Sequence, residues 1–482
     1  MSSKDIQPSQ SNAGEALNGA LNGPLNCAQQ RLWYLYLTAA DRHQFNLVPT
    51  INLHGPIEHR RLNRAIDALL VRHPALRSRI ENTGKGWQVV LPPQPATLGV
   101  SDLTGMSPTE QEAAVSRYRH KELHNPFDLT ESTAPRWQLF KKAADSYQLV
   151  MTVHHIVFDG LSYLVTTKTL AALYTDADLA TDADTPSGPG LIDHALREQS
   201  EEALQGWDAS LSFWRERLRD FPPQLSLPTA SHTEDGTDSF KLAIDATRLK
   251  RIQKWAHAQG VSFFVALKAA FDLTLFHHCG QSRFLVGTDI AGRPLPEFAE
   301  TVGFFINQLP LPCEIEPAMQ VTHWLKQLGD DIHHALEHRH LPFNRLVSSQ
   351  VTDRNQTYSP LFQVKMNYQK RRVQGLQFGD AVLTGDLVHQ HTGPFYLVLD
   401  LVHHEEGLAA EFEYQKRFFS AQKIQLMATQ WLRILESFDD LIQGTLAEAD
   451  ARLARWGREV LSAQQRNAQH QSRPTLKRRR VR

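Results

Sequence analysis

Residues 151–160 constrain the fold more than any other part of the chain, because the sequence pattern changes abruptly within them. The run 147–156 is rich in residues that favour β-strands. From 160 to 174 the apolar spacing becomes helical. We therefore predict a strand that ends at two adjacent histidines and leads into a helix, with polar side chains collected at the junction.

The two histidines of this junction, His154 and His155, are expected to face in opposite directions, because successive side chains of a strand point to opposite faces. Only one of them can then line a given cavity, and the sequence leaves open which face meets solvent. Histidine is the commonest general base, but neutral histidines also occur as satisfied core residues. Asp159 stands directly before the predicted helix, where its carboxylate could cap backbone N–H groups or pair with a cation.

Composition places the chain among globular proteins of two domains or lobes. With 482 residues, the chain is longer than proteins built around a single hydrophobic core usually are. Its contents of 41% apolar and 21% charged residues are typical of globular proteins. The formal net charge is −1, and nothing global indicates nucleic-acid binding. Cys27, Cys279 and Cys313 form no CxxC pair, which suits free thiols in a reducing compartment. With no signal region and no apolar run of about 18 residues, we expect a cytoplasmic protein without a membrane span.

Predicted helices and strands are interspersed in both halves, which is typical of α/β layer structures. The predicted helices are 28–38, 57–73, 160–174, 201–218, 246–259, 261–278, 321–338 and 421–440. The predicted strands are 47–53, 87–91, 136–140, 147–156, 284–290, 361–368, 395–402 and 409–414.

The expected domain organisation follows from composition along the chain. Residues 1–24 are polar and should be a disordered arm. The first lobe is expected over 25–205 and the second over 206–460, with the turn-rich passage 222–236 as the best boundary candidate. Residues 461–482 should form a flexible tail that ends in basic residues. Such a tail could dock an acidic partner, although a merely solvated end is the simpler interpretation.

Motifs spread along the chain resemble those of the condensation domains of nonribosomal peptide synthetases. Residues 154–160 read HHIVFDG and fit the family's HHxxxDG. The other matches are NCAQQRLWYL at 26–35 with SxAQxRLWxL, RHPALR at 72–77 with RHxxLR, PFDL at 126–129, GTDIAGR at 287–293 with GTPVANR, VGFFIN at 302–307 with IGFFVN, HLPF at 340–343 with HQDxPFE, and PLFQV at 360–364 with NPLFQV. Ordered agreement over such a length is far more specific than any single motif.

The resemblance implies an α/β fold of the α+β type, in which two chloramphenicol-acetyltransferase-like lobes form a V-shaped pseudo-dimer with a central tunnel. It also implies an acyltransferase in nonribosomal peptide or hybrid polyketide biosynthesis. The donor would be an acyl-loaded peptidyl or acyl carrier protein whose phosphopantetheine holds the thioester. The acceptor would be an amine or hydroxyl on a second carrier or on a soluble molecule. We expect no bound cofactor, a monomer, and a free-standing enzyme, since carrier, adenylation and thioesterase motifs are absent from this sequence.

The resemblance also assigns roles to single residues. His155 matches the catalytic histidine, which takes or orients the proton of the attacking group, and His154 would face away as a structural residue. Asp159 is expected to pair with Arg293 more than to cap the helix, because an unpaired buried carboxylate is costly. Gly160 would let backbone approach the thioester and donate its N–H to the oxyanion.

Arg72, Asn307 and Tyr396 are candidates to line the substrate tunnel. Tyr396 departs from the family, because GPFYL stands where the family often has a KFDL-like strand. This departure leaves details of the acceptor side open. The intact His154 argues against a heterocyclising relative, in which the motif begins with Asp.

Other functions remain open on the sequence. A metal hydrolase is one, because His334 and His338 share a helical face at a spacing that can hold zinc, although no HExxH pattern is present. We therefore assign no metal ligands. A catalytically silent condensation-like scaffold is another, and an epimerase relative, which also carries HHxxxDG, is a third.

Overall fold

The computed structural model describes residues 22–39, 41–176, 178–179, 188–227, 236–293, 295–350, 359–370, 374–386 and 395–471. The chain forms two compact units. Unit 1 comprises Met1–Leu204, Arg293–Phe305 and Val373–Gln390, and unit 2 comprises Gln205–Gly292, Ile306–Arg372 and His391–Arg482. The first boundary adjoins the predicted one at 205. The two later segments of unit 1, however, were expected in the second lobe.

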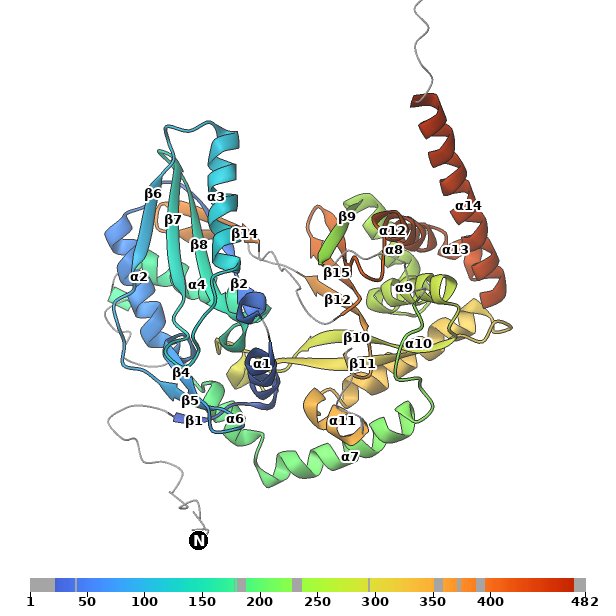
Figure 1. Ribbon diagram of the computed structural model, residues 1–482, viewed down its shortest axis with the longest axis horizontal. Helices are drawn as coiled ribbons and strands as arrows, with labels where there is room; N and C mark the ends of the chain where they lie inside the picture. The colour runs from blue at the N-terminus through green and yellow to red at the C-terminus, as the bar shows by residue number, and fades with distance from the viewer. Residues whose placement is uncertain are drawn as a thin grey trace, which may run out of the picture. The chain divides into compact units, whose positions relative to one another are not determined.

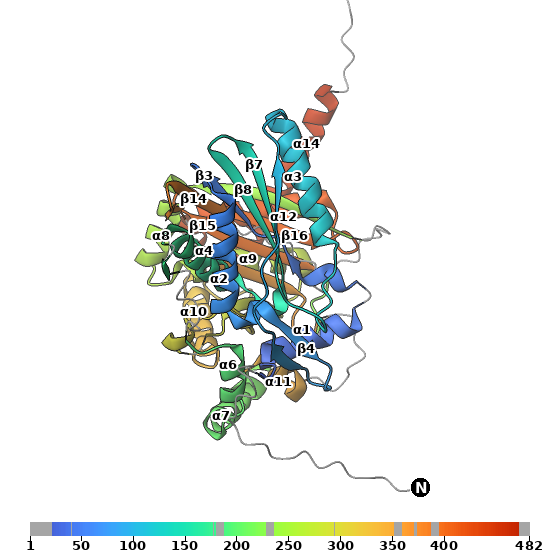
Figure 2. The same cartoon turned by 90° about the vertical axis from the view of Figure 1, so that its left-hand side faces the viewer.

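Unit 1 is built on a seven-stranded sheet, in the order β13-β14-β3-β8-β7-β6 with β2 paired to β8. Its strands are β2 (Asn46–Leu47), β3 (Thr50–His54), β6 (Leu98–Asp102), β7 (Arg136–Ala143), β8 (Ser146–His154), β13 (Gln374–Phe378) and β14 (Ala381–Asp386). Helices α2 (His59–Arg72) and α4 (Gly160–Thr175) pack together on one face, and α3 (Pro108–Leu123) lies on the other (Figures 1 and 2). The unit is therefore a sheet covered on both faces.

Strand β8 lies inside this sheet and leads to the histidines. Val150 packs in one cluster with Val115 of α3, whereas Leu149 and Met151 are buried on the face of α2 and α4. Neither face meets solvent, which answers the question that the sequence left open. The strand ends at His154, and His155 begins a 3₁₀ turn, His155–Val157. The predicted strand to residue 156 is therefore two residues too long, and His155 lies in the turn rather than in the strand.

The smaller elements of unit 1 include a three-stranded sheet in the order β1-β5-β4. Its strands are β1 (Asn22–Pro24), β5 (Trp87–Val90) and β4 (Ser78–Glu81), and helices α1 (Cys27–Thr38) and α6 (Leu191–Arg197) complete the unit. Because β1 pairs with β5, the predicted disordered arm is wrong for residues 22–24. Residues 1–21 lie outside the described part of the chain, as do 180–187 and 228–235 of the predicted connections.

Helix α3 is the largest element of unit 1 that the sequence did not predict. Ser107 caps it and Glu110 completes a capping box, which fixes its start. Only three of its side chains are buried, Gln111, Val115 and Glu122, so its apolar stripe is too thin to stand out. The prediction also lacked β1, β4, β6, β13, β14 and α6 in unit 1 and several elements of unit 2.

Unit 2 is built on a six-stranded sheet in the order β11-β10-β12-β15-β16-β9. Its strands are β9 (Thr237–Asp245), β10 (Arg283–Ala291), β11 (Ile306–Glu314), β12 (Val364–Lys370), β15 (Leu397–His404) and β16 (Gly407–Gln415). Its helices are α8 (Ala246–Ala258), α9 (Phe263–Cys279), α10 (Val321–Glu337), α11 (Phe343–Gln350), α12 (Ala421–Glu436), α13 (Phe438–Leu441) and α14 (Leu446–Gln471), and α7 (Glu201–Leu218) enters it across the boundary. Helices α8, α9 and α12 pack against one face of the sheet.

Helix α14 replaces the first half of the predicted tail. The helix continues to Gln471, so a flexible tail that begins at 461 is wrong, and residues 472–482 lie outside the described chain (Figure 1). In the part of the chain that the structure describes, no single helix is long and apolar enough to span a bilayer. Helices α8 and α9 pass that test only when taken together across a 99° bend.

Buried neutral histidines should make the fold sensitive to acid. Burial lowers the pKa of His73 and His194 to about 4 and that of His154 and His278 to about 3. These groups stay neutral in the folded chain but take up protons in the unfolded chain below about pH 6.5. We therefore expect the free energy of unfolding to be highest above pH 6.5 and to fall as the pH drops from 6.5 towards 4.

Urea unfolding at a series of pH values measures this effect, and a variant isolates it from the carboxylates. His278→Gln should reduce the slope by about 1.4 kcal/mol per pH unit in that window, because one depressed histidine is removed. The matched change at an exposed histidine, His333→Gln, should leave the slope unchanged. Equal slopes for the His278 variant and the parent would contradict this explanation.

Candidate active site

His155 is held by a closed pair of hydrogen bonds at the end of β8. Its ring Nδ1 lies 2.6 Å from the carbonyl oxygen of Phe158, and the N–H of Phe158 donates to the carbonyl of His155 at 3.1 Å. A carbonyl only accepts, so Nδ1 must carry the proton. In the neutral ring Nε2 is then the basic nitrogen. The half-buried ring also packs edge-on against Phe304, with ring centroids 4.9 Å apart.

His154 lies in an apolar environment beside the turn, and its predicted structural role at the active site stays a prediction. Its side chain is fully buried, and its Nδ1 accepts the N–H of Ile156 at 3.1 Å. Three aromatic rings surround its imidazole, with ring centroids 5.7 to 6.1 Å from its own: those of Tyr36, Phe45 and Phe127. This apolar environment lowers its pKa to about 3, chiefly by desolvation, so the ring is neutral at physiological pH.

Asp159 and Arg293 form the ion pair that the sequence predicts. The pair is bidentate, with Nη1 to Oδ2 at 2.9 Å and Nη2 to Oδ1 at 3.1 Å, and both side chains are almost fully buried. The guanidinium also lies 4.4 Å from the ring centroid of Phe305. Asp159 is the cap of α4 as well, because Oδ1 accepts the N–H of Ser162 at 2.8 Å. The expectation that pairing would take precedence over capping is wrong: the carboxylate does both.

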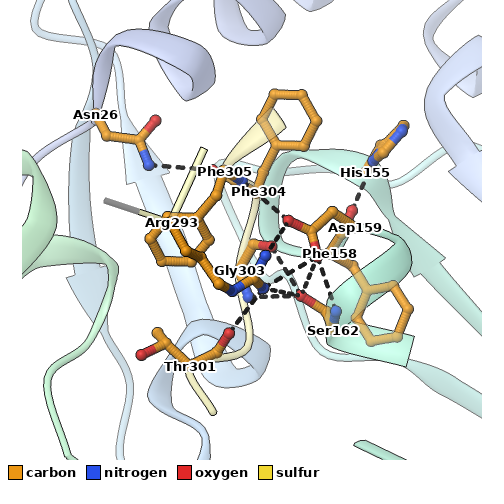
Figure 3. A network of polar contacts seen from close by, with 10 residues as sticks. All are labelled: Asn26, His155, Phe158, Asp159, Ser162, Arg293, Thr301, Gly303, Phe304 and Phe305. Carbon is orange, nitrogen blue, oxygen red and sulfur yellow. Dashed lines mark hydrogen bonds and ion pairs between the residues drawn. The ribbon is translucent and has the colours of Figure 1, made fainter. Parts of the chain in front are cut away.

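Further bonds tie the segment 293–305 to this carboxylate (Figure 3). The N–H of Phe305 donates to Asp159 Oδ2 at 3.2 Å, and Arg293 Nη2 donates to the carbonyl of Thr301 at 2.9 Å. The hydroxyl of Ser162 lies 2.8 Å from both Asp159 Oδ1 and the carbonyl of Gly303, and it accepts the N–H of Gly303 at 2.9 Å. Such additional hydrogen bonds offset the cost of burying the charge pair, and among its donors and acceptors only Nε of Arg293 is buried without a hydrogen-bond partner in the described part of the chain.

Asn26 and Gln29 are positioning residues that were not assigned from the sequence. Asn26 caps α1 and donates from Nδ2 to the carbonyl of Phe304 at 3.1 Å. Gln29 donates from Nε2 to the carbonyl of Ile156 at 3.0 Å. Helix α1 thus holds both the turn that carries His155 and the segment that carries Phe304. Their place in the opening motif NCAQQRLWYL was the available signal.

Gly160 is the first residue of α4, directly after the cap. The N–H groups of a first helical turn have no partner within the helix, so this position suits an oxyanion donor. The oxyanion role stays a prediction. His155 points away from the ion pair (Figure 3).

The three predicted lining residues have different environments. Arg72 ends α2 and is half-buried. The side-chain amide of Asn307 forms hydrogen bonds with two backbone groups. Its Nδ2 donates to the carbonyl of Leu341 at 2.7 Å, and its Oδ1 accepts the N–H of Phe343 at 2.9 Å. The ring of Tyr396 is buried and packs against the ring of Phe418, with ring centroids 3.9 Å apart. Tyr396 is therefore a packing residue of unit 2. Contact of these residues with substrate stays a prediction.

The two histidines considered for a metal site, His334 and His338, differ in their surroundings. His338 stacks on Phe213 and bonds the hydroxyl of Ser210 at 3.1 Å, whereas His334 is exposed. Among the described residues, no group of three or more histidine, cysteine or carboxylate side chains is arranged to hold a metal ion.

The match to a known protein family extends over most of the chain. A family model described as the condensation domain matches residues 22–451. The chain belongs to the condensation domain family. Condensation domains of nonribosomal peptide synthetases form peptide bonds and work with substrates held on carrier proteins. The predicted family and the α/β fold class of two lobes are thereby confirmed, whereas the V-shaped arrangement and the tunnel stay predictions.

The chain covers only part of the curated synthetases that it matches. The dimodular nonribosomal peptide synthase of Bacillus subtilis is 28% identical over 436 residues, which are 86% of this chain and 18% of that protein. Phosphinothricin tripeptide synthetase PhsC of Streptomyces viridochromogenes is 30% identical over 410 residues, which are 82% of this chain and 37% of that protein. The condensation domain thus spans less than half of either relative.

Solved structures share the fold at lower identity. The X-domain from teicoplanin biosynthesis superposes with a TM-score of 0.77 at 20% identity, covering 91% of this chain and 99% of that one. The first condensation domain of the calcium-dependent antibiotic synthetase, in complex with a substrate analogue, gives 0.75 at 19% identity, covering 89% and 98%. These likenesses establish the fold.

Loss of Arg293 should destabilise unit 1 strongly. Arg293→Ala leaves the buried Asp159 carboxylate without its charge partner, and breaking such a pair costs about 3–5 kcal/mol. Arg79→Ala removes an exposed pair with Glu81 and should have a far smaller effect. Chemical denaturation of the three proteins checks this. If Arg293→Ala unfolded at the same midpoint as the parent, the pair would not support the fold.

Proposed function

We propose that this condensation domain transfers an acyl group from the phosphopantetheine thioester of a carrier protein to an amine or hydroxyl acceptor. The observation that carries the proposal is the hydrogen bond between His155 Nδ1 and the carbonyl of Phe158. It fixes the tautomer in which Nε2 is basic. A histidine in this form can accept the proton of an attacking nucleophile.

The chemistry proposed for the site needs one base and one place for developing negative charge. Nε2 of His155 accepts the hydrogen bond of the acceptor's N–H or O–H as the nucleophile adds to the thioester carbonyl. The amide of Gly160, at the start of α4, donates to the oxyanion. As the new bond to the carbonyl carbon forms, the proton passes to Nε2; collapse of the tetrahedral intermediate then breaks the C–S bond, and the thiolate of the carrier arm leaves and takes up that proton. A thiolate is a good leaving group, so correct placement of the nucleophile supplies much of the rate.

Two substitutions of His155 separate proton transfer from placement. His155→Ala should lower kcat/KM about 10²-fold to 10⁴-fold, the usual contribution of a general base. His155→Gln retains a hydrogen-bond acceptor but cannot take up the proton. Substantial activity in the Gln variant would assign the role to placement, and loss in both variants would assign it to proton transfer.

The assay uses carrier proteins loaded with defined acyl groups and supplied as separate polypeptides, with amine, alcohol and carrier-bound acceptors, and mass spectrometry of the products. Circular dichroism melting shows whether each variant is folded. Wild-type activity in folded His155→Ala would contradict the proposed role of this residue. The same experiment tests whether the chain accepts a carrier in trans.

Other outcomes would support the alternatives. A fold neighbour, the X-domain from teicoplanin biosynthesis, was solved in complex with OxyB. A parent protein that coupled no substrate would therefore favour a recruiting scaffold. Inversion of a carrier-bound residue without coupling would favour an epimerase. Stoichiometric zinc, whose removal abolished hydrolysis, would favour a metal hydrolase.

A further inference from the structure

The imidazole ring of His155 is restrained by a hydrogen bond and by a ring contact, both within unit 1 (Figure 3). The bond from Nδ1 to the carbonyl of Phe158 holds one edge of the ring. Hydrogen bonds accept a range of angles, and the outer torsion of a histidine side chain is broad, so this bond alone leaves the ring plane free to tilt. The ring of Phe304 packs against the imidazole, with centroids 4.9 Å apart and planes at 74°, and so limits that tilt.

The backbone around Phe304 is held by hydrogen bonds at three successive residues. These bonds run from the N–H of Gly303 to Ser162 Oγ at 2.9 Å, from Asn26 Nδ2 to the carbonyl of Phe304 at 3.1 Å, and from the N–H of Phe305 to Asp159 Oδ2 at 3.2 Å. The three residues that bind this backbone through their side chains are almost fully buried. Breaking such buried bonds is costly, so they fix the backbone that carries the Phe304 ring.

The same segment is packed closely against α6. A Cβ added at Gly303 would lie 2.5 Å from the side chain of Leu191, the first residue of that helix. Phe304 and Phe305 are each only 2% exposed. Because a protein interior is densely packed, the surrounding core sets the position of the Phe304 ring.

Asn26 makes a bond that capping alone does not require. Its Oδ1 accepts the N–H of Gln29 at 2.8 Å and caps α1, whereas its Nδ2 donates to Phe304. The family motif SxAQxRLWxL has Ser at this position, and serine caps helices about as well as asparagine does. The longer amide side chain therefore adds a link from α1 to Phe304 beyond its role as a cap.

We propose that Phe304 is a positioning residue for His155 and that Asn26 acts through it. The ring of Phe304 keeps the imidazole in the plane in which Nδ1 bonds the carbonyl of Phe158. Nε2 then keeps one direction relative to the nucleophile of the acceptor, and a base held in this way reacts more often than one that tilts. This inference rests on the proposed function, because it concerns the base of that reaction.

Phe304→Leu tests the ring contact, because leucine keeps an apolar side chain but removes the flat ring. With an acyl-loaded carrier and an amine acceptor, kcat should fall about 10-fold while KM changes less than about 2-fold. The ring acts on the orientation of the base, so substrate binding should be largely unaffected. An unchanged kcat would overturn the proposal.

Phe140→Leu is the matched control for packing. Phe140 is also buried in unit 1, and its ring meets that of Tyr118 at 5.4 Å and 75°, a geometry similar to that of Phe304 and His155. It packs with Val115 on the α3 side of the sheet. This control should keep kcat within about 2-fold of the parent, and circular dichroism melting shows whether each variant is folded. Equal losses of kcat in the two variants would show a general effect of a lost ring and would contradict the positioning role.

A second substitution changes the support of the ring and leaves the ring itself intact. Asn26→Ser keeps a cap for α1 but shortens the side chain that reaches Phe304, and kcat should fall about 3-fold. In the Phe304→Leu background the same substitution should not lower kcat further, because Asn26 acts through the ring. Full activity of Asn26→Ser, or additive losses in the double variant, would refute the proposed action of Asn26.

Nitrogen-15 spectra of histidine-labelled protein separate this inference from the proposed function, because they need no substrate. In the parent the neutral His155 ring should carry its proton on Nδ1, and Phe304→Leu should populate both tautomers as the ring turns away from Phe158. If the parent forms no product but Phe304→Leu shows this change, the positioning role stands and the proposed reaction fails. If product forms and Phe304→Leu matches the parent in both kcat and spectrum, the reaction stands and the positioning role fails.

Discussion

The buried pair of Asp159 and Arg293 is the interaction on which the candidate active site depends. Its carboxylate caps α4, accepts the N–H of Phe305 and meets the guanidinium through two bonds. The start of α4 and the segment 293–305 therefore meet at one side chain. Because a buried charge pair needs partners for its polar groups, these bonds favour one arrangement of the strand end and of the segment 293–305.

This arrangement fixes His155 without touching it. The strand stops at His154, whose ring accepts a hydrogen bond from the turn that follows, and the cap of α4, Asp159, is held by Arg293. Between these two fixed ends the turn has little freedom, so the carbonyl of Phe158 stays within reach of His155 Nδ1. The ion pair thus holds the backbone of the turn, and this backbone in turn holds the histidine ring. Helix α1 secures the same turn from outside through Gln29.

Much of this site could be predicted from sequence, because its contacts are short in sequence or follow a family motif. The strand-to-helix junction and the partner of Asp159 are examples. The turn at His155 was not predictable from periodicity, since an isolated apolar pattern does not reveal where a ladder ends. The bond from Asn26 to Phe304 joins residues 278 positions apart, and the pairing of β14 with β3 joins segments more than 300 apart. No local pattern encodes such pairings. The same holds for the rings of Phe304 and His155, which meet although they lie far apart in the sequence.

The tautomer of His155 in the folded protein tests the proposed mechanism most directly. Nitrogen-15 spectra of histidine-labelled protein, assigned by comparison with His155→Gln, distinguish a protonated Nδ1 from a protonated Nε2. We predict that the neutral ring occurs as a single tautomer, with the proton on Nδ1 and none on Nε2. A proton on Nε2, or a mixture of the two tautomers, would contradict the mechanism, because the nitrogen proposed to receive the acceptor's proton would then be occupied.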